Sequence, residues 1–292
     1  MFAIKNAGTL CALAAYVIWG LYPLYFCFLN EMPLWMVIFG RMAFSCLLLM
    51  PIAFGKTCAD STIQAIRSPQ ALTLAFLAGI FISGNWFLYQ LAVNLDRVLD
   101  VSLAYFVTPI INVAIGAAVL KERLGKRGAA ALILAVSAML FLSAARGQAP
   151  WIAASLGTVF AMYCCAKKIT ALPAATGVFL ENVLSLPVIT ACIVFFVPES
   201  TDIWMNQSYR DLLLLFGCGL ITIIPLCLFS AAAKSIPLSK LGFLQYTEPT
   251  LNAAVAMLFL SQYPDRYDVL AFFAVWIAIF LACGPKRRLS AK

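Results

Sequence analysis

Residues 242–257 read GFLQYTEPTLNAAVAM, where one carboxylate, Glu248, stands among apolar side chains and is followed directly by Pro249. The rest of the chain is similarly apolar: of its 292 residues, 64% are apolar and only 11% are charged. A soluble domain is usually about 45–50% apolar and about 25% charged. The composition therefore predicts a protein whose outer surface faces lipid, and the role of Glu248 depends on that solvent.

Apolar segments long enough to cross a bilayer, which takes roughly 20 residues, recur along the chain. We expect ten of them, at about 7–29, 33–54, 70–93, 98–119, 127–144, 150–166, 173–197, 210–233, 238–260 and 267–284. The connections between them are short, so little chain is left for a separate soluble domain. The first segment continues past a short motif that looks like a cleavage site, and we expect it to be retained as a span.

The placement of basic residues predicts the orientation of the chain. With the amino terminus in the cytoplasm, 15 of the 20 Lys and Arg residues fall on the cytoplasmic side, four fall outside, and Arg41 lies within a span. Such an excess on the inner side is the usual topology signal. We therefore expect a multi-pass protein of the bacterial inner membrane with both termini cytoplasmic. The net charge of +8 then reflects topology and does not indicate nucleic-acid binding.

A weak internal repeat relates residue n to residue n+140. Pro109 aligns with Pro249, and the order of span, short turn, span and central proline is kept around them. Each half holds five predicted spans, so the second half starts from the opposite side of the membrane. We expect an all-α membrane protein of ten transmembrane helices, built as two inverted five-helix repeats (1–147 and 148–292) around a central cavity. Secondary transporters often follow this plan.

Polar residues form matching stripes on the two central spans, with the spacing i, i+3, i+7 that places them on one helix face. The stripes are Tyr105, Thr108 and Asn112 on the fourth span, and Gln245, Glu248 and Asn252 on the ninth. Such residues either join spans by hydrogen bonds or line a polar space, and the matched pair favours a shared cavity. Pro109 and Pro249 each remove a backbone donor, so we expect both helices to kink there.

Three ionisable residues fall within predicted spans: Arg41 in the second, Glu181 in the seventh and Glu248 in the ninth. A charge in hydrocarbon costs about 2.5–3.5 kcal/mol on insertion scales, so each is expected to pair, to face water or to become neutral. Arg41 stays charged, and we expect an acid or backbone carbonyls beside it. Glu248 is interpreted as a coupling carboxylate that loads and releases a proton, as a counter-ion for a cationic solute, or as a structural acid.

Aromatic and amide side chains gather on the first and third spans. They are Tyr16, Trp19 and Tyr22, followed by Asn85, Trp86, Tyr89 and Gln90. Such rings form belts at membrane interfaces or, with a few placed amides, line a passage for an organic solute. The ten cysteines are interpreted as small packing residues. Because the chain has no histidine and no Cys/His cluster, we expect no metal site, no cofactor and no catalytic group.

Six stretches together give the chain a family resemblance. They are AYVIWGLYPLYF (15–26), GNWFLYQLAVN (84–94), SLAYFVTPIINVAIG (102–116), PWIAASLGTVFAMY (150–163), LENVLSLP (180–187) and IPLSKLGFLQYTEPTLN (236–252). Through them the chain resembles, nearly end to end, the RarD-type branch of the EamA family in the drug/metabolite transporter superfamily. The resemblance implies ten helices in two inverted repeats, a central cavity and alternating access without ATP.

The family's motifs fall on residues already singled out. Its Trp-Gly-Leu-Tyr-Pro run lies at 19–23, its Asn-Trp pair at Asn85 and Trp86, its span-two arginine at Arg41 and its span-seven glutamate at Glu181. The histidine that often precedes the arginine is Gly40 here. Glu248 stands where the family pattern has a small or apolar residue, so proton coupling through it is a hypothesis about this chain alone.

The function expected from the sequence is secondary transport of small organic metabolites or drugs, as a permease or exporter, with protons as a candidate coupling ion. An ATP-driven pump is disfavoured because the chain has no G-x-x-x-x-G-K-[ST] loop. Two alternatives stay open. One is an intramembrane enzyme acting on a lipid or isoprenoid phosphate, which would need clustered basic residues at a membrane face. The other is a passive solute channel, which would show neither saturation nor proton linkage.

Overall fold

The computed structural model describes residues 2–29, 31–94, 108, 111–112, 114–119, 121, 125–147, 151–200, 205, 207–259 and 266–283. These residues form helices joined by short turns, with no strand among them. The elements are α1 (Phe2–Gly20), α2 (Tyr22–Phe26), the 3-10 turn η1 (Cys27–Leu29), α3 (Leu34–Ala53), α4 (Ala59–Ile66), α5 (Pro69–Asn94), α7 (Lys126–Arg146), α8 (Trp151–Ile169), α9 (Ala174–Phe196), α11 (Tyr209–Ser235), α12 (Leu238–Gln245), α13 (Thr247–Phe259) and α14 (Arg266–Cys283).

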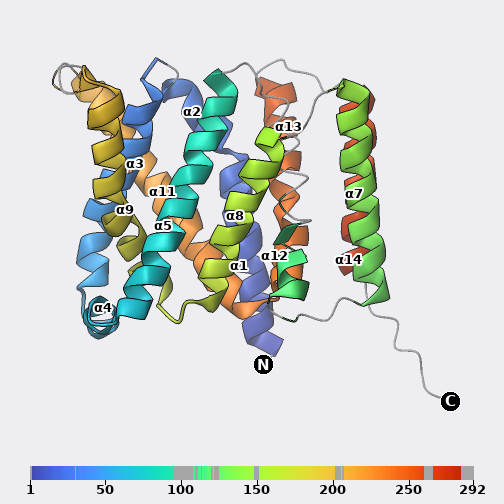
Figure 1. The fold of residues 1–292 in the computed structure, drawn as a ribbon, viewed down its shortest axis with the longest axis horizontal. Helices are drawn as coiled ribbons and strands as arrows, with labels where there is room; N and C mark the ends of the chain where they lie inside the picture. The colour runs from blue at the N-terminus through green and yellow to red at the C-terminus, as the bar shows by residue number, and fades with distance from the viewer. Residues whose placement is uncertain are drawn as a thin grey trace.

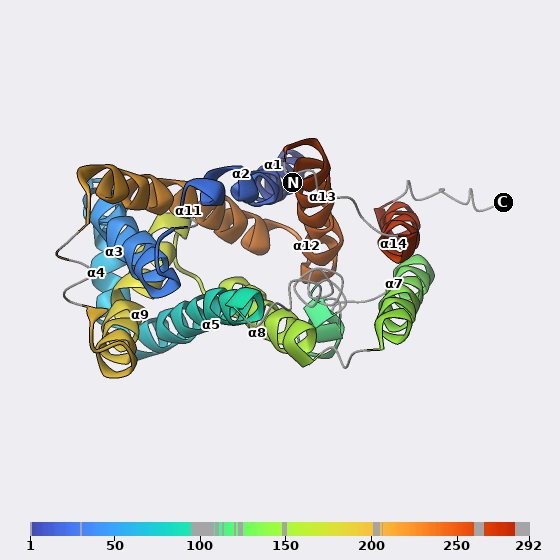
Figure 2. The ribbon, with the colours of Figure 1, turned by 90° about the horizontal axis from the view of Figure 1, so that it is seen from above.

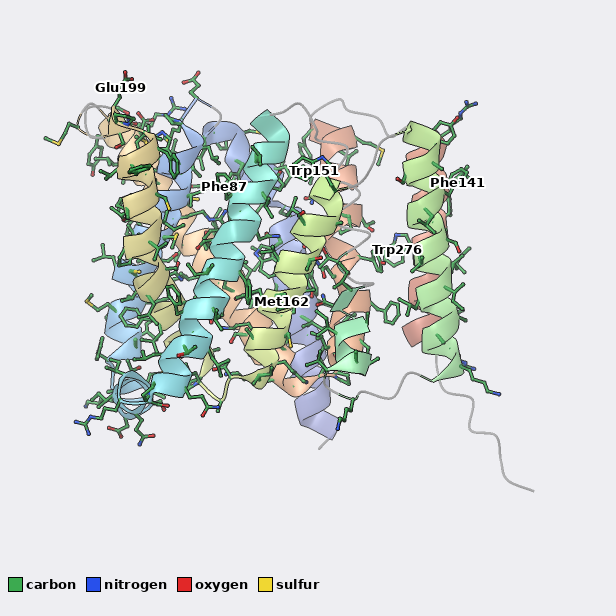
Figure 3. The ribbon with its side chains drawn as sticks, viewed as in Figure 1. Phe87, Phe141, Trp151, Met162, Glu199 and Trp276 are labelled. Carbon is green, nitrogen blue, oxygen red and sulfur yellow. The ribbon has the colours of Figure 1, made fainter. Side chains whose placement is uncertain are left out.

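The long helices run side by side along one direction, with α4 and the amino-terminal end of α1 at the same edge (Figure 1). Large apolar side chains cover the outside of this arrangement, and Glu199 lies at the edge opposite α4 (Figure 3). Four of the labelled outer side chains, Phe87, Phe141, Trp151 and Met162, are 41–55% exposed. Large apolar groups around the middle and charge at the edge are what a bilayer requires of a protein surface.

Within the described residues, six helical segments are long and apolar enough to cross a membrane. They are Ala7–Leu29, Leu34–Ala53, Pro69–Tyr89, Lys126–Ala145, Ala174–Phe196 and Tyr209–Ser235. These correspond to six of the ten predicted spans. Of the other four, three match α8, α12 with α13, and α14, and the fourth (98–119) lies mostly outside the described residues.

Local sequence signals explain several helix ends. Ser208 and Asp211 form a capping box at the start of α11, each satisfying a backbone N–H of the other. Gly147 ends α7 in the left-handed conformation (φ 62°), which glycine adopts without steric cost. α3 and α9 each begin directly after a proline, Pro33 and Pro173. Each N-cap is therefore a proline, which has no backbone N–H that could remain unpaired.

Two major helix contacts of the described residues recur when the two halves of the chain are exchanged. α1 packs on α11 as α8 packs on α5, and α11 packs on α3 as α5 packs on α9. The remaining major pairs, α3 with α9 and α7 with α14, join one helix from each half. Seen from above, α7 and α14 stand together at one end, beside the main group of helices (Figure 2).

Helix starts follow the same offset of 140 residues that the sequence repeat predicted. α3 and α9 begin at Leu34 and Ala174, and α5 and α11 begin at Pro69 and Tyr209. α7 and α14 begin at Lys126 and Arg266, again 140 residues apart. These starts lie outside the stretch in which the sequence repeat was recognised, so they are independent of it.

Two glycines related by this offset, Gly79 in α5 and Gly219 in α11, sit at close helix crossings. A Cβ atom added to Gly219 would lie 2.6 Å from the Cβ of Phe44, and one added to Gly79 would lie 2.9 Å from the Oγ of Ser185. At the first crossing the Ser45 hydroxyl donates a hydrogen bond to the Gly219 carbonyl at 3.3 Å. Small residues at such crossings let membrane helices pack backbone to backbone.

Two of the predicted spans are interrupted at prolines. α12 ends at Gln245 and α13 begins at Thr247, with Pro249 in its first turn. Because Pro249 has no N–H, the Gln245 carbonyl loses its helical donor, and the expected kink is a break at Tyr246. The first span is similarly broken between α1 and α2, where Pro23 lies in the first turn. Pro109 lies outside the described residues.

Candidate functional site

The two broken spans touch each other next to Glu248. A Cβ atom added to Gly20, the last residue of α1, would lie 2.6 Å from the Cβ of Leu251 and 3.1 Å from the Glu248 carbonyl oxygen. The Glu248 side chain is 9% exposed, and no basic group of the described residues lies within 4.0 Å of it. Glu248 is therefore a buried acid at a helix break, without an ion-pair partner in the described part of the chain.

The polar stripes of the two halves meet through Asn112 and Gln245. The Asn112 Nδ2 donates a hydrogen bond to the Gln245 Oε1 at 3.3 Å, and both side chains are buried. The Oδ1 atoms of Asn112 and Asn252 are also buried but have no hydrogen-bond partner in the described residues. A buried polar atom left unpaired costs about 1–3 kcal/mol, so both oxygens favour a donor from solute or water. Thr108, four residues before Asn112 in the sequence, is also buried. Tyr105 lies outside the described residues.

Arg41 in α3 is surrounded by rings and one hydroxyl. Its Nε donates a hydrogen bond to the Thr222 Oγ1 of α11 at 3.2 Å. The guanidinium carbon lies 3.9 Å from the centroid of the Trp86 ring, 5.6 Å from that of Phe26 and 5.9 Å from that of Tyr22. The expectation of an acid or backbone carbonyls beside Arg41 is therefore wrong for the described residues. Its neighbours are instead aromatic faces, which attract a cation through their quadrupoles.

Glu181 in α9 pairs with a lysine that the sequence placed in a cytoplasmic loop. The Lys167 Nζ lies 2.5 Å from the Glu181 Oε1, and the Tyr163 hydroxyl donates a hydrogen bond to the Oε2 at 3.4 Å. The side chains of Lys167 and Glu181 are 0% and 2% exposed. α8 continues to Ile169, three residues beyond the predicted span, and this extension carries Lys167 inside. One signal was available, because Lys167 follows Tyr163 by four residues and so shares its helix face.

Tyr16 and Trp19 lie in a cluster of rings between the halves. Phe229 of α11 is 6.1 Å from Tyr16, 5.5 Å from Trp19 and 5.8 Å from Tyr163, centroid to centroid. The Tyr16 hydroxyl donates to the Leu241 carbonyl at 3.2 Å. Because both residues are buried here, the interfacial-belt interpretation does not apply to them.

The remaining predicted residues lie in different surroundings. The Tyr22 hydroxyl donates to the Ile221 carbonyl at 2.8 Å, and the Asn85 Nδ2 donates to the Leu156 carbonyl of α8 at 3.3 Å, so both hold helices together. Trp86 faces Arg41, whereas Tyr89 is 41% exposed. The side chain of Gln90 lies outside the described residues.

A helical protein with an apolar exterior and with buried polar groups between its two halves is a multi-pass membrane protein. Residues 6–144 match the model of the EamA-like transporter family. The chain is 35% identical to protein RarD of Escherichia coli (strain K12), over 93% of this chain and 92% of that protein. It is 33% identical to an uncharacterized transporter of Pseudomonas aeruginosa, over 93% of this chain and 91% of the relative.

The chain belongs to the EamA-like transporter family of the drug/metabolite transporter superfamily, as a homologue of RarD, and the resemblance seen in the sequence is confirmed. A protein of known crystal structure has the same fold, with a TM-score of 0.76 over 98% of this chain and 100% of that one, at 17% identity.

Proposed function

We propose that this protein is a secondary active transporter of small organic solutes that works by alternating access between two inverted five-helix repeats, residues 1–147 and 148–292. The proposal is carried by the correspondence between the two halves of the chain. Three pairs of helices start 140 residues apart, and helices at equivalent positions pack against equivalent partners. The family model covers residues 6–144, which is the extent of one such unit. Ten spans, an even number, put both termini on the same side of a bacterial inner membrane. The excess of basic residues indicates that this side is the cytoplasm.

The solute site lies between the repeats, where the stripes of Asn112 and Gln245 meet and the breaks of α1/α2 and α12/α13 touch. Discontinuous helices near the midplane are the usual site-forming elements of such transporters. Unpaired oxygens on Asn112 and Asn252 offer acceptors, and Trp86 and Tyr89 offer ring surface. Glu248 is the candidate group for proton coupling, because it is a buried acid without a described basic partner.

A second pair of equivalent positions is formed by Arg41, which borders the solute site through Trp86, and Glu181. Each is the eighth residue of its helix, α3 or α9, and each faces the first span of its own repeat, through Tyr22 and Phe26 or through Tyr163 and Lys167. Because the repeats are inverted, Arg41 and Glu181 lie at similar depths measured from opposite faces of the membrane. The buried Lys167–Glu181 pair then closes the cytoplasmic end in this conformation and separates when that end opens.

Counterflow distinguishes this function from the alternatives. Proteoliposomes loaded with a metabolite are expected to take up labelled metabolite faster than empty ones, with saturation, because a carrier exchanges solute through a reorienting site. Candidate metabolites come from a thermal-shift screen of the purified protein. Flux that rises linearly with concentration and gains nothing from preloading would indicate a channel. Turnover of a lipid phosphate without solute exchange would indicate an enzyme.

Cysteine labelling tests the inverted orientation. Gln70 and Arg210 are related by the offset of 140, lie in the first turns of α5 and α11, and are both exposed. In a cysteine-free background, Arg210→Cys is expected to react with a membrane-impermeant maleimide in intact cells. Gln70→Cys is expected to react only after the membrane is opened. Reaction of both from the same side would show that the repeats run in parallel.

A further inference from the structure

Arg41 carries a buried positive charge for which the described part of the protein supplies no negative partner. Its side chain is 7% exposed, and the Nε bond to Thr222 is its single hydrogen bond among the described residues. The four N–H donors on Nη1 and Nη2 are therefore free of described protein acceptors. No described carboxylate lies within 4.0 Å of the guanidinium group.

At the equivalent position in the other repeat, the buried charge has a partner within the protein itself. Glu181 has Lys167 at 2.5 Å, and the pair is sealed from solvent. Besides the Thr222 hydroxyl, the described neighbours of Arg41 are the faces of Trp86, Phe26 and Tyr22, which attract a cation more weakly than a carboxylate does. All three rings are partly exposed.

The remaining contacts aim the guanidinium at an incoming ligand. Thr222 accepts from the Nε and donates its own hydroxyl proton to the Cys218 carbonyl at 2.7 Å, so its orientation is fixed from α11. The Trp86 ring lies against the guanidinium group, with its centroid 3.9 Å from the guanidinium carbon. The outer edge, formed by Nη1 and Nη2, is the edge that a carboxylate recognises with two parallel hydrogen bonds.

We propose that the missing partner of Arg41 is the solute, and that the solute is a small organic carboxylate with an apolar or aromatic body. This inference rests on the proposed function and names the substrate class of the same site. The carboxylate accepts two hydrogen bonds from the Nη atoms, and the body of the molecule lies against Trp86, Tyr22 and Phe26. Rings that surround one charged group are the common composition of a small-molecule site.

Matched ligand pairs test the proposal on the purified protein in detergent. Benzoate, phenylacetate and 3-phenylpropionate are titrated calorimetrically beside their primary amides, which have nearly the same shape but no charge. At least one acid is expected to bind roughly 30-fold tighter than its amide, because a buried charge pair is lost in the amide complex. Arg41→Met is expected to remove that preference, and Arg67→Met, at an exposed arginine, to leave it unchanged.

The stability of the ligand-free protein separates a binding role from a structural one. Arg41→Met removes an unpaired buried charge and keeps an apolar side chain of similar length, so its melting temperature is expected to equal or exceed that of the wild type. A clear loss of stability would assign Arg41 to the fold and overturn the proposal. Thr222→Val keeps the charge and removes only the acceptor of the Nε, and a smaller weakening of acid binding is expected.

The other outcomes are equally decisive. Equal binding of acids and amides, binding of no acid by the wild type, or unchanged acid binding by Arg41→Met would overturn the proposal. Acid binding through Arg41 without any counterflow would contradict the proposed function and leave this inference standing. Counterflow restricted to neutral or cationic solutes would contradict this inference and leave the proposed function standing.

Discussion

Lys167→Met is expected to lower the free energy of unfolding by about 3–5 kcal/mol, because it leaves the Glu181 carboxylate buried without its partner. The two charged atoms lie 2.5 Å apart, and neither side chain is more than 2% exposed. Glu181→Met is expected to cost a similar amount by stranding Lys167. Unfolding of the purified protein in mixed micelles at increasing denaturing-detergent content measures both effects.

The double variant Lys167→Met/Glu181→Met makes this prediction specific to the pair. Replacing both members of a buried ion pair with apolar residues of similar size is often neutral or stabilising, so most of the loss is expected to be recovered. Lys56→Met, at an exposed lysine of the same edge, is the control and should change stability little. A double variant as unstable as the sum of the singles would contradict the prediction, since it would show that the two residues act independently.

The same variants bear on the mechanism. If the pair closes the cytoplasmic end, the stable double variant is expected to fold normally but to show faster solute leak from that side. Leak from inside-out and right-side-out vesicles distinguishes the two ends. Unchanged leak at both ends would leave the pair with a purely structural role and would remove it from the gating scheme.

The all-helical membrane class and the offset between helix starts were accessible from the sequence, because they depend on length, periodicity and spacing. The offset of 140 came from residues around Pro109 and Pro249, and the helix starts of α3, α9, α5 and α11 obey it. The break at Tyr246 was harder to place. A proline predicts a disturbance of the helix, but tertiary contacts decide whether it becomes a bend or an interruption.

Side-chain partners were less accessible, because they depend on contacts between distant segments. Tyr16 and Trp19 are three residues apart and so share one helix face, but helical phase cannot say whether that face meets other rings or an open passage. Lys167 was missed because a lysine after an apolar run is normally interpreted as a loop residue. Arg41 was expected to need an acid, and the rule that buried charges pair fails here in the described residues, which is the kind of local conflict expected at a functional site.

Glu248 presents the second conflict, and its position argues against one of the roles left open by the sequence, that of a structural acid. A structural acid would be expected to have a basic partner or several hydrogen-bond donors, and the described residues provide neither within reach. The residue lies at the break between α12 and α13, against the end of α1. That junction between the repeats is where relative movement would change the access of water to the carboxylate. The placement favours proton coupling over a structural role.

Glu248→Gln is therefore expected to abolish accumulation driven by a pH gradient and to preserve counterflow. A gradient of one pH unit corresponds to about 1.4 kcal/mol and supports up to about tenfold accumulation for one coupled proton. In the variant, the ratio of internal to external solute should stay near one, because an amide cannot exchange the proton. The similar shape of glutamine leaves the site intact. The control is Glu199→Gln, at an exposed acid of the membrane edge (Figure 3). Full pH-driven accumulation by Glu248→Gln would remove the coupling role, whereas a loss confined to cationic solutes would identify Glu248 as their counter-ion.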